Sequence, residues 1–375
     1  MKKIQMVDLK GQYDFIHQEV TEAMTEVFET SSYINGPMVQ KFQKDLENYL
    51  GVKHVIPCAN GTDALQIALM GLKLEPGDEV ITTDFTFAAT VEVISLLKLK
   101  PVLVDVDPQT FNIAPKAIEK AITTKTKAII PVHLFGQCAN MDEILALAKK
   151  HKLYVVEDNA QGIGATYTFP DGSKAKTGTL GHVAATSFFP SKNLGAYGDG
   201  GAIFTNDDEL AHFIRGIVNH GMYTRYYHDV VGVNSRLDAL QAAVLKIKLQ
   251  YLDFYNERRK EAALRYNNFF NDHPNLIIPH READCDSHVY HQYTLRVIDA
   301  DRDALVVYLG EHEIPCGVYY PVPLHAQKAY KDSNIDPKAF PVTNQLVKEV
   351  ISLPMHTELT KDQIDFIASK VLEFF

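Results

Sequence analysis

Three polar motifs in the first half of the chain each follow a short apolar run and could carry chemistry. The first, CANGTDALQIAL from Cys58, runs directly into a helical pattern, which puts Asn60, Gly61 and Thr62 at a helix N-terminus. Free backbone N–H groups and the helix dipole favour an anion there, and glycine allows a close backbone approach. An ordinary helix cap by Asn60 or Thr62 is the competing interpretation.

The second motif, YVVEDNAQG, places two adjacent carboxylates at the end of a buried strand. A buried carboxylate is costly unless it is paired or hydrogen-bonded. Glu157 and Asp158 should point to opposite faces if the strand continues through them, and we assign Asp158 to the ligand side. A salt-bridged or capping aspartate would explain this motif equally well when it is viewed alone.

The third motif, ATSFFPSKNLGAYGDGGAIF, contains Lys192 in an apolar and glycine-rich setting. Apolar neighbours lower the pKa of an amine and promote Schiff-base formation with an aldehyde. A solvent-exposed loop lysine is the competing interpretation. Four glycines after the lysine would let the backbone pass close to a bulky ligand: Gly195, Gly198, Gly200 and Gly201.

The order of the three motifs is more informative than any one of them. An anion site comes first, a strand-end carboxylate follows about a hundred residues later, and the lysine follows after 34 more. Pyridoxal phosphate (PLP) needs a phosphate site, a carboxylate that keeps its ring nitrogen protonated, and an amine for its aldehyde. The order is typical of PLP enzymes of the aspartate-aminotransferase type.

The elements that must position these motifs alternate between about residues 52 and 206. The β-rich runs are short and lack polar alternation, as in strands buried on both faces of a parallel sheet. We therefore predict an α/β fold with helices on both faces of the sheet, a hairpin-like or antiparallel edge near 184–205, and functional groups at the carboxyl ends of the strands. The expected strands are Lys53–Pro57, Glu79–Thr83, Pro101–Asp105, Ala128–His133, Tyr154–Glu157, Ala184–Phe188 and Gly201–Thr205, and the expected helices are Asp63–Leu72, Ala89–Leu97, Lys116–Ala121 and Met141–Lys150.

The pattern changes after Arg236. Residues 237–268 predict one or two long helices, and Tyr290–Val297 and Ile314–Tyr320 predict strands of a smaller α+β domain. We expect a large PLP-binding domain over residues 1–248 and a small C-terminal domain over 249–375.

Bulk properties exclude several other classes. The net charge of -10 in 375 residues argues against nucleic-acid binding. The N-terminus has no signal-peptide pattern and no apolar run reaches membrane-spanning length, so we expect a cytoplasmic enzyme without membrane insertion. The cysteines are scattered and predict reduced thiols: Cys58, Cys138, Cys285 and Cys316. His288 and His291 lie three residues apart, but nothing nearby completes a zinc site, and we expect no metal.

Five motifs resemble the DegT/DnrJ/EryC1/StrS family of PLP-dependent sugar aminotransferases, and the resemblance covers essentially the whole chain. The motifs are NGTDALQIAL, PGDEVITTDFTFAAT, VVEDNAQ, SFFPSKNLGAYGDGGAIFTND and VGVNSRLDALQAA. The run from Ser187 to Asp207 looks closest to enzymes that aminate C3 of a UDP-linked 3-keto-hexuronic acid. The resemblance implies PLP fold type I, L-glutamate as amino donor, a nucleotide-linked keto-sugar as acceptor, and a place in polysaccharide or lipopolysaccharide biosynthesis.

The resemblance also implies a role for each matching position. Lys192 would be the catalytic Schiff-base lysine, Asp158 would pair with the ring nitrogen, and Gln161 would contact the phenolic oxygen. Phe87 would stack on the ring, where other members carry Tyr or Trp. The phosphate would lie at Asn60, Gly61, Thr62 and Ser187, and Asn234 would reach it from the neighbouring subunit of a homodimer with shared active sites.

Four positions are implied for the substrate. Arg236 has the planar fork that suits a carboxylate. Tyr319 and Tyr320 resemble the segment that approaches the sugar from the partner chain, although the commoner pattern there is His-Tyr. His325 follows the general family pattern, whereas some 3-keto-uronate enzymes differ there.

Several other functions remain as alternatives. The acceptor could be a dTDP-linked 3-keto sugar or a UDP- or dTDP-linked 4-keto deoxysugar. A PLP-dependent sugar dehydratase typically has histidine where this chain has Lys192. A non-catalytic PLP-binding regulatory protein would not need the lysine, the aspartate and the phosphate residues together. A dinucleotide-dependent oxidoreductase would need G-x-G-x-x-G after its first strand, which is missing from this sequence context.

Overall fold

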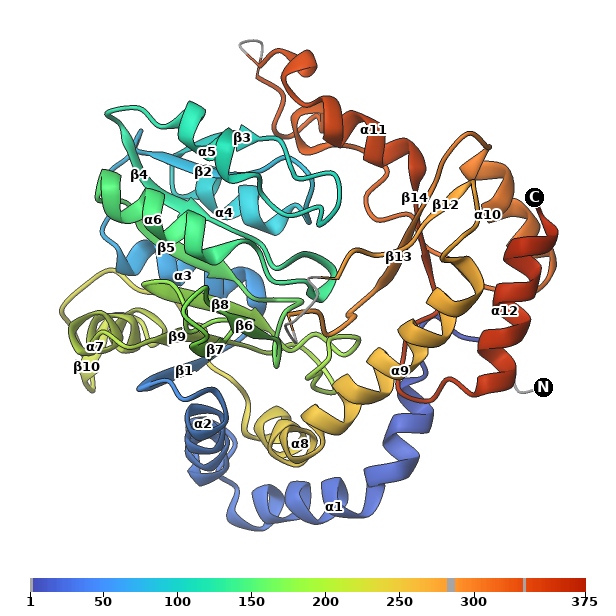
Figure 1. Ribbon diagram of the computed structural model, residues 1–375. Helices are drawn as coiled ribbons and strands as arrows, with labels where there is room; N and C mark the ends of the chain where they lie inside the picture. Colours follow the sequence, from blue (N-terminus) through green and yellow to red (C-terminus); the bar gives the residue numbers. More distant parts are fainter. Residues whose placement is uncertain (1–2, 282–286, 333–334) are drawn as a thin grey trace.

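The computed structural model describes residues 3–281, 287–332 and 335–375 (Figure 1). Its main sheet has seven strands: β1 (His54–Cys58), β2 (Glu79–Thr83), β3 (Lys100–Val104), β4 (Thr126–Ile130), β5 (Tyr154–Asp158), β8 (Val183–Ser187) and β9 (Gly201–Thr205). Their order is β1-β9-β8-β5-β4-β2-β3. All neighbours are parallel except β9, which is antiparallel to both β1 and β8. The predicted α/β fold with a mostly parallel sheet is confirmed.

Helices cover both faces of this sheet. They are α1 (Leu9–Thr30), α2 (Pro37–Leu50), α3 (Gly61–Gly71), α4 (Ala89–Leu96), α5 (Pro115–Ala121), α6 (Met141–His151), α7 (Asp208–Ile217), α8 (Ala239–Gln250), α9 (Leu252–Phe270), α10 (Arg302–Glu311), α11 (Pro341–Glu349) and α12 (Lys361–Glu373), with short 3-10 turns η1 (Leu134–Gly136), η2 (Leu324–Ala326) and η3 (Pro337–Ala339). Because successive strand residues face opposite sides, Val55 and Phe204 pack toward α2 and α8, whereas Ile56 and Ile203 pack toward α3 and α7.

The expected strands of the main sheet all form, within three residues of their predicted ends. The predicted antiparallel pair near 184–205 is β8 and β9, but β9 lies inside the sheet rather than at its edge. Residues 237–268 form two helices, α8 and α9, separated at Tyr251. The predicted strand Ile314–Tyr320 is wrong. Only Gly317 pairs, with Ser352, because Pro315 within the segment and Pro321 directly after it have no backbone N–H to donate to a ladder.

A second sheet lies beside α9, α10 and α12 (Figure 1). It consists of β12 (Leu276–Ile277), β13 (Tyr293–Val297) and β14 (Val350–Leu353) in the order β12-β13-β14. Its core also takes in Ile4, so the first described residues of the chain pack with the last third. We propose the domain division after residue 248, which lies in the last turn of α8.

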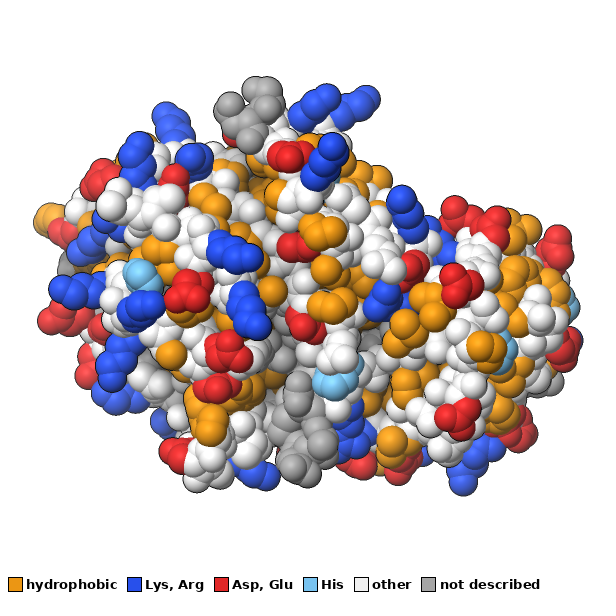
Figure 2. Space-filling model, turned by 45° about the horizontal axis from the view of Figure 1, so that its top comes forward, with side chains coloured by type: hydrophobic (Ala, Val, Ile, Leu, Met, Phe, Trp, Pro, Cys, Tyr) orange, Lys and Arg blue, Asp and Glu red, His pale blue; other side chains and the backbone are white. Residues whose placement is uncertain are grey.

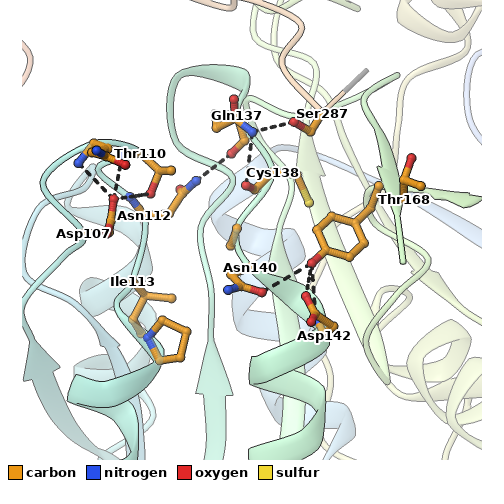
Figure 3. Close-up of a pocket in the computed structure, with 14 residues that line it drawn as sticks. Asp107, Thr110, Asn112, Ile113, Gln137, Cys138, Asn140, Asp142, Thr168 and Ser287 are labelled. Atoms are coloured by element: carbon orange, nitrogen blue, oxygen red, sulfur yellow. Dashed lines mark hydrogen bonds between the residues drawn. The ribbon is translucent and has the colours of Figure 1, made fainter. Parts of the chain in front are cut away.

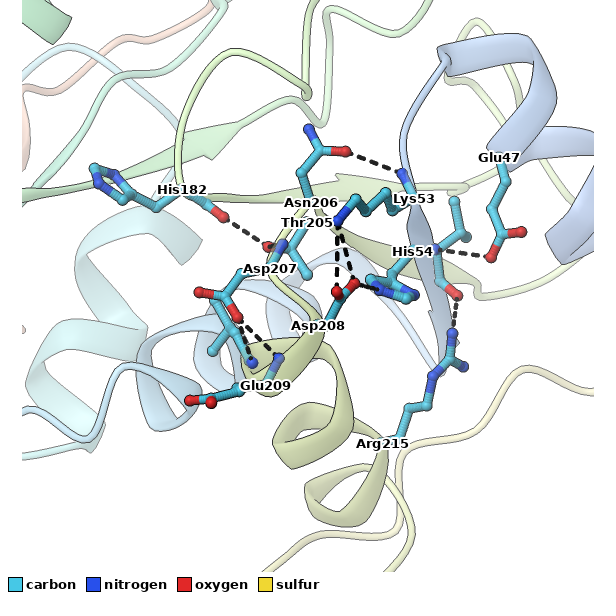
Figure 4. A network of polar contacts seen from close by, with 12 residues as sticks. Glu47, Lys53, His54, His182, Thr205, Asn206, Asp207, Asp208, Glu209 and Arg215 are labelled. Carbon is cyan, nitrogen blue, oxygen red and sulfur yellow. Dashed lines mark hydrogen bonds and ion pairs between the residues drawn. The ribbon is translucent and has the colours of Figure 1, made fainter.

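The edge strand β1 is fastened to its neighbours by polar contacts (Figure 4). Lys53 and His54 both reach the carboxylate of Asp208, at 3.4 and 2.8 Å, and Arg215 donates to the Val55 carbonyl at 3.3 Å. Asp207 caps α7 by accepting from two of its backbone N–H groups. These contacts lie on the outer edge of the sheet, away from the motifs that carry chemistry.

Two short hairpins, β6 (Thr166–Thr168) with β7 (Lys174–Lys176) and β10 (Met222–Thr224) with β11 (Tyr227–His228), complete the described elements. No helix among the described residues is both long and apolar enough to cross a membrane. Cys58 and Cys316 are free thiols, Cys138 is buried, and Cys285 lies outside the described residues. Figure 2 shows basic and acidic side chains interspersed over one face of the molecule.

Candidate active site

The predicted anion site forms where α3 begins. Asn60 is the N-cap, and its side-chain oxygen accepts from the Asp63 N–H at 2.8 Å. A Cβ on Gly61 would lie 2.6 Å from the Cβ of Ser187, so glycine is what allows α3 to start against the end of β8. The cap therefore uses the Asn60 side chain, while the first turn of α3 begins at Gly61 against Ser187, where a helix N-terminus can bind a phosphate.

Asp158 ends β5 and is 5% exposed. Its carboxylate accepts from the Thr90 hydroxyl at 2.8 Å and from the Ala160 N–H at 3.2 Å. Burial raises the pKa of Asp158, and the two hydrogen bonds and the charge of Lys192 act against that rise. Thr90 lies in the first turn of α4, and sequence reasoning missed it because the contact spans 68 residues of chain.

Glu157, the neighbouring carboxylate, has a separate set of partners. It is fully buried, and it accepts from the N–H groups of Gly178, Leu180 and Gly181 at 2.6–2.7 Å. The His133 ring nitrogen lies 2.9 Å away on the same carboxylate. These contacts hold the turn that leads into β8, so Glu157 stabilises the sheet and does not face the ligand side.

Lys192 lies in the loop from β8 to β9. Burial lowers the pKa of its amine to about 8, and the nearby Asp158 charge opposes this effect. Its backbone N–H donates to the Phe189 carbonyl at 2.8 Å, which shapes the turn. The side chain is half-buried rather than free in solvent, so an exposed loop lysine does not describe it.

Two residues that sequence reasoning missed hold this loop from outside. Lys248 of α8 is buried and donates to the Gly195 carbonyl at 2.7 Å, and burial lowers the pKa of its amine to about 7. Asn193 donates to the Asn256 side chain at 2.7 Å and to the Val289 carbonyl at 3.1 Å. The backbone around Lys192 is thereby fixed to α8, α9 and the segment before β13.

Three aromatic residues, Phe87, Phe135 and Tyr320, lie around Gln161. The Gln161 side chain accepts from the Phe135 N–H at 2.6 Å and donates to the Tyr320 hydroxyl at 3.3 Å. The Phe87 ring is 59% exposed, and its centroid lies 6.5 Å from that of Tyr320. Tyr320 therefore lies beside Gln161 and Phe87 of its own chain. The approach of its segment to the sugar of a partner chain stays a prediction.

The remaining predicted positions are spread over two places. Asn234 and Arg236 line a cavity of 410 Å³ together with Ala59 and Asp199, and this cavity contains neither Lys192 nor Asp158. Tyr319 is half-buried beside Gly317. His325 is 7% exposed, and its Nδ1 lies 2.6 Å from the Asp84 carboxylate.

Other polar groups lie apart from this site. A cavity of 470 Å³ lies between the loops after β3 and β4 and the β6–β7 hairpin (Figure 3), and none of the predicted site residues lines it. Burial lowers the pKa of His288 to about 3. His291, by contrast, lies near the site, because its ring contacts Asn193 next to Lys192. Among the described residues no three His, Cys, Asp or Glu side chains gather as metal ligands would.

The arrangement fits PLP at each point that the cofactor needs. The anion site follows β1, the exposed Phe87 ring follows β2, Asp158 ends β5, and Lys192 with its lowered pKa follows β8. All four lie at the same edge of the sheet. Gly61 and Ser187 touch only because neither carries a bulky group there.

Comparison with known proteins gives consistent results. The model of the DegT/DnrJ/EryC1/StrS aminotransferase family matches residues 14–372. The chain is 46% identical to the pleiotropic regulatory protein of Geobacillus stearothermophilus, over 99% of this chain and 98% of that protein. It is 45% identical to UDP-2-acetamido-2-deoxy-3-oxo-D-glucuronate aminotransferase of Pseudomonas aeruginosa, over 98% and 99%. It is 41% identical to dTDP-3-amino-3,6-dideoxy-alpha-D-galactopyranose transaminase of Aneurinibacillus thermoaerophilus, over 98% of each.

Solved structures share the whole fold. An aminotransferase from Brucella abortus has a TM-score of 0.94 at 42% identity, covering 99% of each chain. NtdA from Bacillus subtilis, solved with bound cofactor PMP, has a TM-score of 0.90 at 31% identity, covering 100% of this chain and 85% of that one.

Proposed function

Because the chain belongs to the DegT/DnrJ/EryC1/StrS aminotransferase family, we propose that it transfers the amino group of L-glutamate to C3 of a UDP-linked 3-keto-hexuronic acid. Family membership makes it a PLP-dependent transaminase that acts on the keto group of a nucleotide-linked sugar. The observation that carries the finer assignment is its 45% identity, over nearly its full length, to an aminotransferase named for a UDP-linked 3-oxo-glucuronate.

Residues of this chain would hold the cofactor at three points. Gly61, Thr62 and Ser187 would bind its phosphate, Asp158 would keep its ring nitrogen protonated, and Phe87 would cover one face of the ring. When bound, PLP supplies an electron-accepting ring through which an amino group passes from donor to acceptor.

Lys192 would carry the proton transfers. With a pKa of about 8, its amine is partly neutral near physiological pH and can both take and return a proton there. The contacts of the loop from β8 to β9 hold the backbone from which that amine extends. Gln161, already held by Phe135, would face the phenolic oxygen of the ring.

A homodimer with shared sites is part of this proposal. Asn234 and Arg236 line a cavity beside Ala59 whose lining does not include Lys192. We propose that a second copy brings its own Asn234 and Arg236 to the site. In that arrangement Asn234 of the partner subunit would bind the phosphate. Arg236 of the partner subunit would bind the sugar carboxylate through its planar fork.

The test uses purified protein and two substrates. L-glutamate should bleach the yellow band of the PLP-loaded enzyme, and a UDP-linked 3-keto-uronate should restore it faster than the matching neutral 3-keto-hexose. Arg236→Ala should reduce kcat/KM for the uronate far more than for the neutral sugar. Arg258→Ala serves as a control, because that arginine lies on α9 and pairs with Glu261. Equal losses on both sugars would refute the carboxylate assignment.

A dTDP-linked 3-keto sugar is the second candidate. Identity of 41% to a dTDP-sugar transaminase, over 98% of each chain, favours it. Faster recovery of the band with a dTDP-linked neutral sugar than with the UDP-linked uronate would select it. One relative is named as a regulatory protein, yet Lys192, Asp158 and the anion site of this chain form the complete set that catalysis needs.

A further inference from the structure

Asp84 and His325 form a buried pair between distant parts of the chain. Asp84 directly follows β2 and is fully buried. One carboxylate oxygen accepts from the His325 N–H at 2.7 Å, and the other lies 2.6 Å from His325 Nδ1. The Asp84 carbonyl also accepts from the Leu324 N–H at 3.1 Å. Three hydrogen bonds thus fasten η2 to the end of β2.

The pair joins two walls of the active site. Phe87 lies three residues after Asp84, in the loop that leads to α4 and Thr90. Tyr320 lies five residues before His325 and reaches Gln161. The β2 side belongs to the central sheet and is fixed, because the Asp84 N–H donates to the Val104 carbonyl of β3 at 3.0 Å. Releasing the pair would therefore free mainly the segment that carries Tyr320.

The His325 ring is placed for support rather than for binding. Its face stacks on Phe340, with centroids 4.8 Å apart and planes at 11°, and its Nδ1 is committed to Asp84. A hydrogen bond to a buried carboxylate is among the stronger ones, and losing it leaves the carboxylate short of a donor.

We propose that His325 is a positioning residue that acts through Asp84 to hold Tyr320 against Gln161, and that it is not a ligand of the sugar. This inference rests on the proposed function for the identity of the sugar substrate. The contact between Asp84 and His325 itself is independent of that function. It reverses the role that the sequence pattern implied for His325.

Two amide variants separate these roles. In His325→Asn the amide nitrogen stands where Nδ1 stood, so the donor to Asp84 is kept. In His325→Gln the amide stands where Nε2 stood, so the donor to Asp84 is lost while a group that could touch substrate remains. We expect His325→Asn to stay within about threefold of wild type, and His325→Gln to lose roughly 10- to 100-fold in kcat/KM for the sugar. The loss should lie in KM for the sugar, with the rate of bleaching by L-glutamate within about threefold.

The opposite order, with glutamine active and asparagine impaired, would overturn the proposal in favour of direct binding through Nε2. Equal activity of both variants, or equal loss in both, would overturn it as well. Phe340→Leu keeps the hydrogen bond but removes the stacking ring, and it provides a milder variant if His325→Gln does not fold. A rise of about two- to fivefold in KM for the sugar is expected there, and no rise would count against the proposal.

A measurement without substrate separates this inference from the proposed function. The backbone N–H groups of Leu324 and His325 donate to Asp84, so their hydrogen exchange reports the pair in the protein without cofactor. Exchange should be at least tenfold faster in His325→Gln than in His325→Asn. If wild type accepts no nucleotide-linked sugar, the proposed function fails, and this comparison still decides the role of His325. Equal exchange in the two variants would overturn it.

Discussion

Thr90→Val removes the hydroxyl that supports Asp158 while it keeps the shape of the side chain. The Thr90 hydroxyl donates to Asp158 at 2.8 Å in a site where Asp158 is 5% exposed, so solvent cannot replace the lost bond. Hydrogen bonds to charged groups contribute about 1.5–3 kcal/mol, which corresponds to a factor of about 10 to 150. The ionised carboxylate must pair with the protonated ring nitrogen, so the Kd for PLP should rise by up to that factor.

The pH dependence of this effect has a definite sign. Burial already raises the pKa of Asp158, and loss of the Thr90 bond raises it further. Ion pairing with the ring is present above that pKa and is lost as the pH falls through it. In Thr90→Val the affinity for PLP should therefore fall off at a higher pH than in wild type. Fluorescence or absorbance titration with PLP between pH 5 and 9 measures both the affinity and this midpoint.

Two controls make the result decisive. Thr90→Ser keeps the hydroxyl and should bind PLP within about threefold of wild type. Thr82→Val removes another buried threonine hydroxyl, which donates to the Ile130 carbonyl at 2.9 Å, and should affect stability without moving the pH midpoint. If Thr90→Val matches Thr90→Ser in affinity and midpoint, the support of Asp158 by Thr90 is refuted.

Three further predictions concern the same edge of the sheet. Because burial lowers the pKa of Lys192 to about 8, trapping of pyridoxal on the cofactor-free protein with borohydride should rise through pH 8, and a midpoint near 10.5 would contradict this. Glu157→Gln should lower the free energy of unfolding by about 3 kcal/mol in urea titration, because its amide faces backbone N–H donors; a loss below 1 kcal/mol would show that those contacts matter little. Gly61→Ala should weaken PLP binding at least tenfold, because the new Cβ at position 61 would collide with Ser187. An unchanged Kd in a titration with PLP would disprove this.

The fold could be predicted from the sequence where the signal is local. Buried strands and the helices between them follow from periodicity, and they bring the three motifs to one edge of the sheet. Alternation along β5 also separates Glu157 from Asp158 without any knowledge of their partners. The strand predicted over Ile314–Tyr320 does not form. Val318 and Tyr319 have the residue types of a strand, but they are partly buried in a loop against the cluster of Phe85, Phe111 and Phe135, and they form no strand pairing.

Residues that act through distant contacts could not be predicted in this way. Thr90 meets Asp158 across 68 residues, and His325 meets Asp84 across 241. Nothing in the local sequence of either partner specifies such a contact. The first depends on how α4 lies against the end of β5, and the second on how the last third of the chain folds back onto the central sheet.

Three carboxylates near the ends of β2 and β5 show what distinguishes a ligand site from structural support. Glu157 accepts from three backbone N–H groups and contacts His133, which nearly fills the capacity of a carboxylate. Asp84 is taken up by His325 on both oxygens. Asp158 accepts two hydrogen bonds from the described part of the chain, one on each oxygen, so each oxygen keeps capacity for a further donor. Asp84 also accepts one bond on each oxygen, but it is fully buried and both bonds come from His325, whereas Asp158 is 5% exposed and lies close enough to Lys192 for that charge to act on its pKa. Of the three, Asp158 is thus the carboxylate that we expect to meet the protonated nitrogen of a ligand.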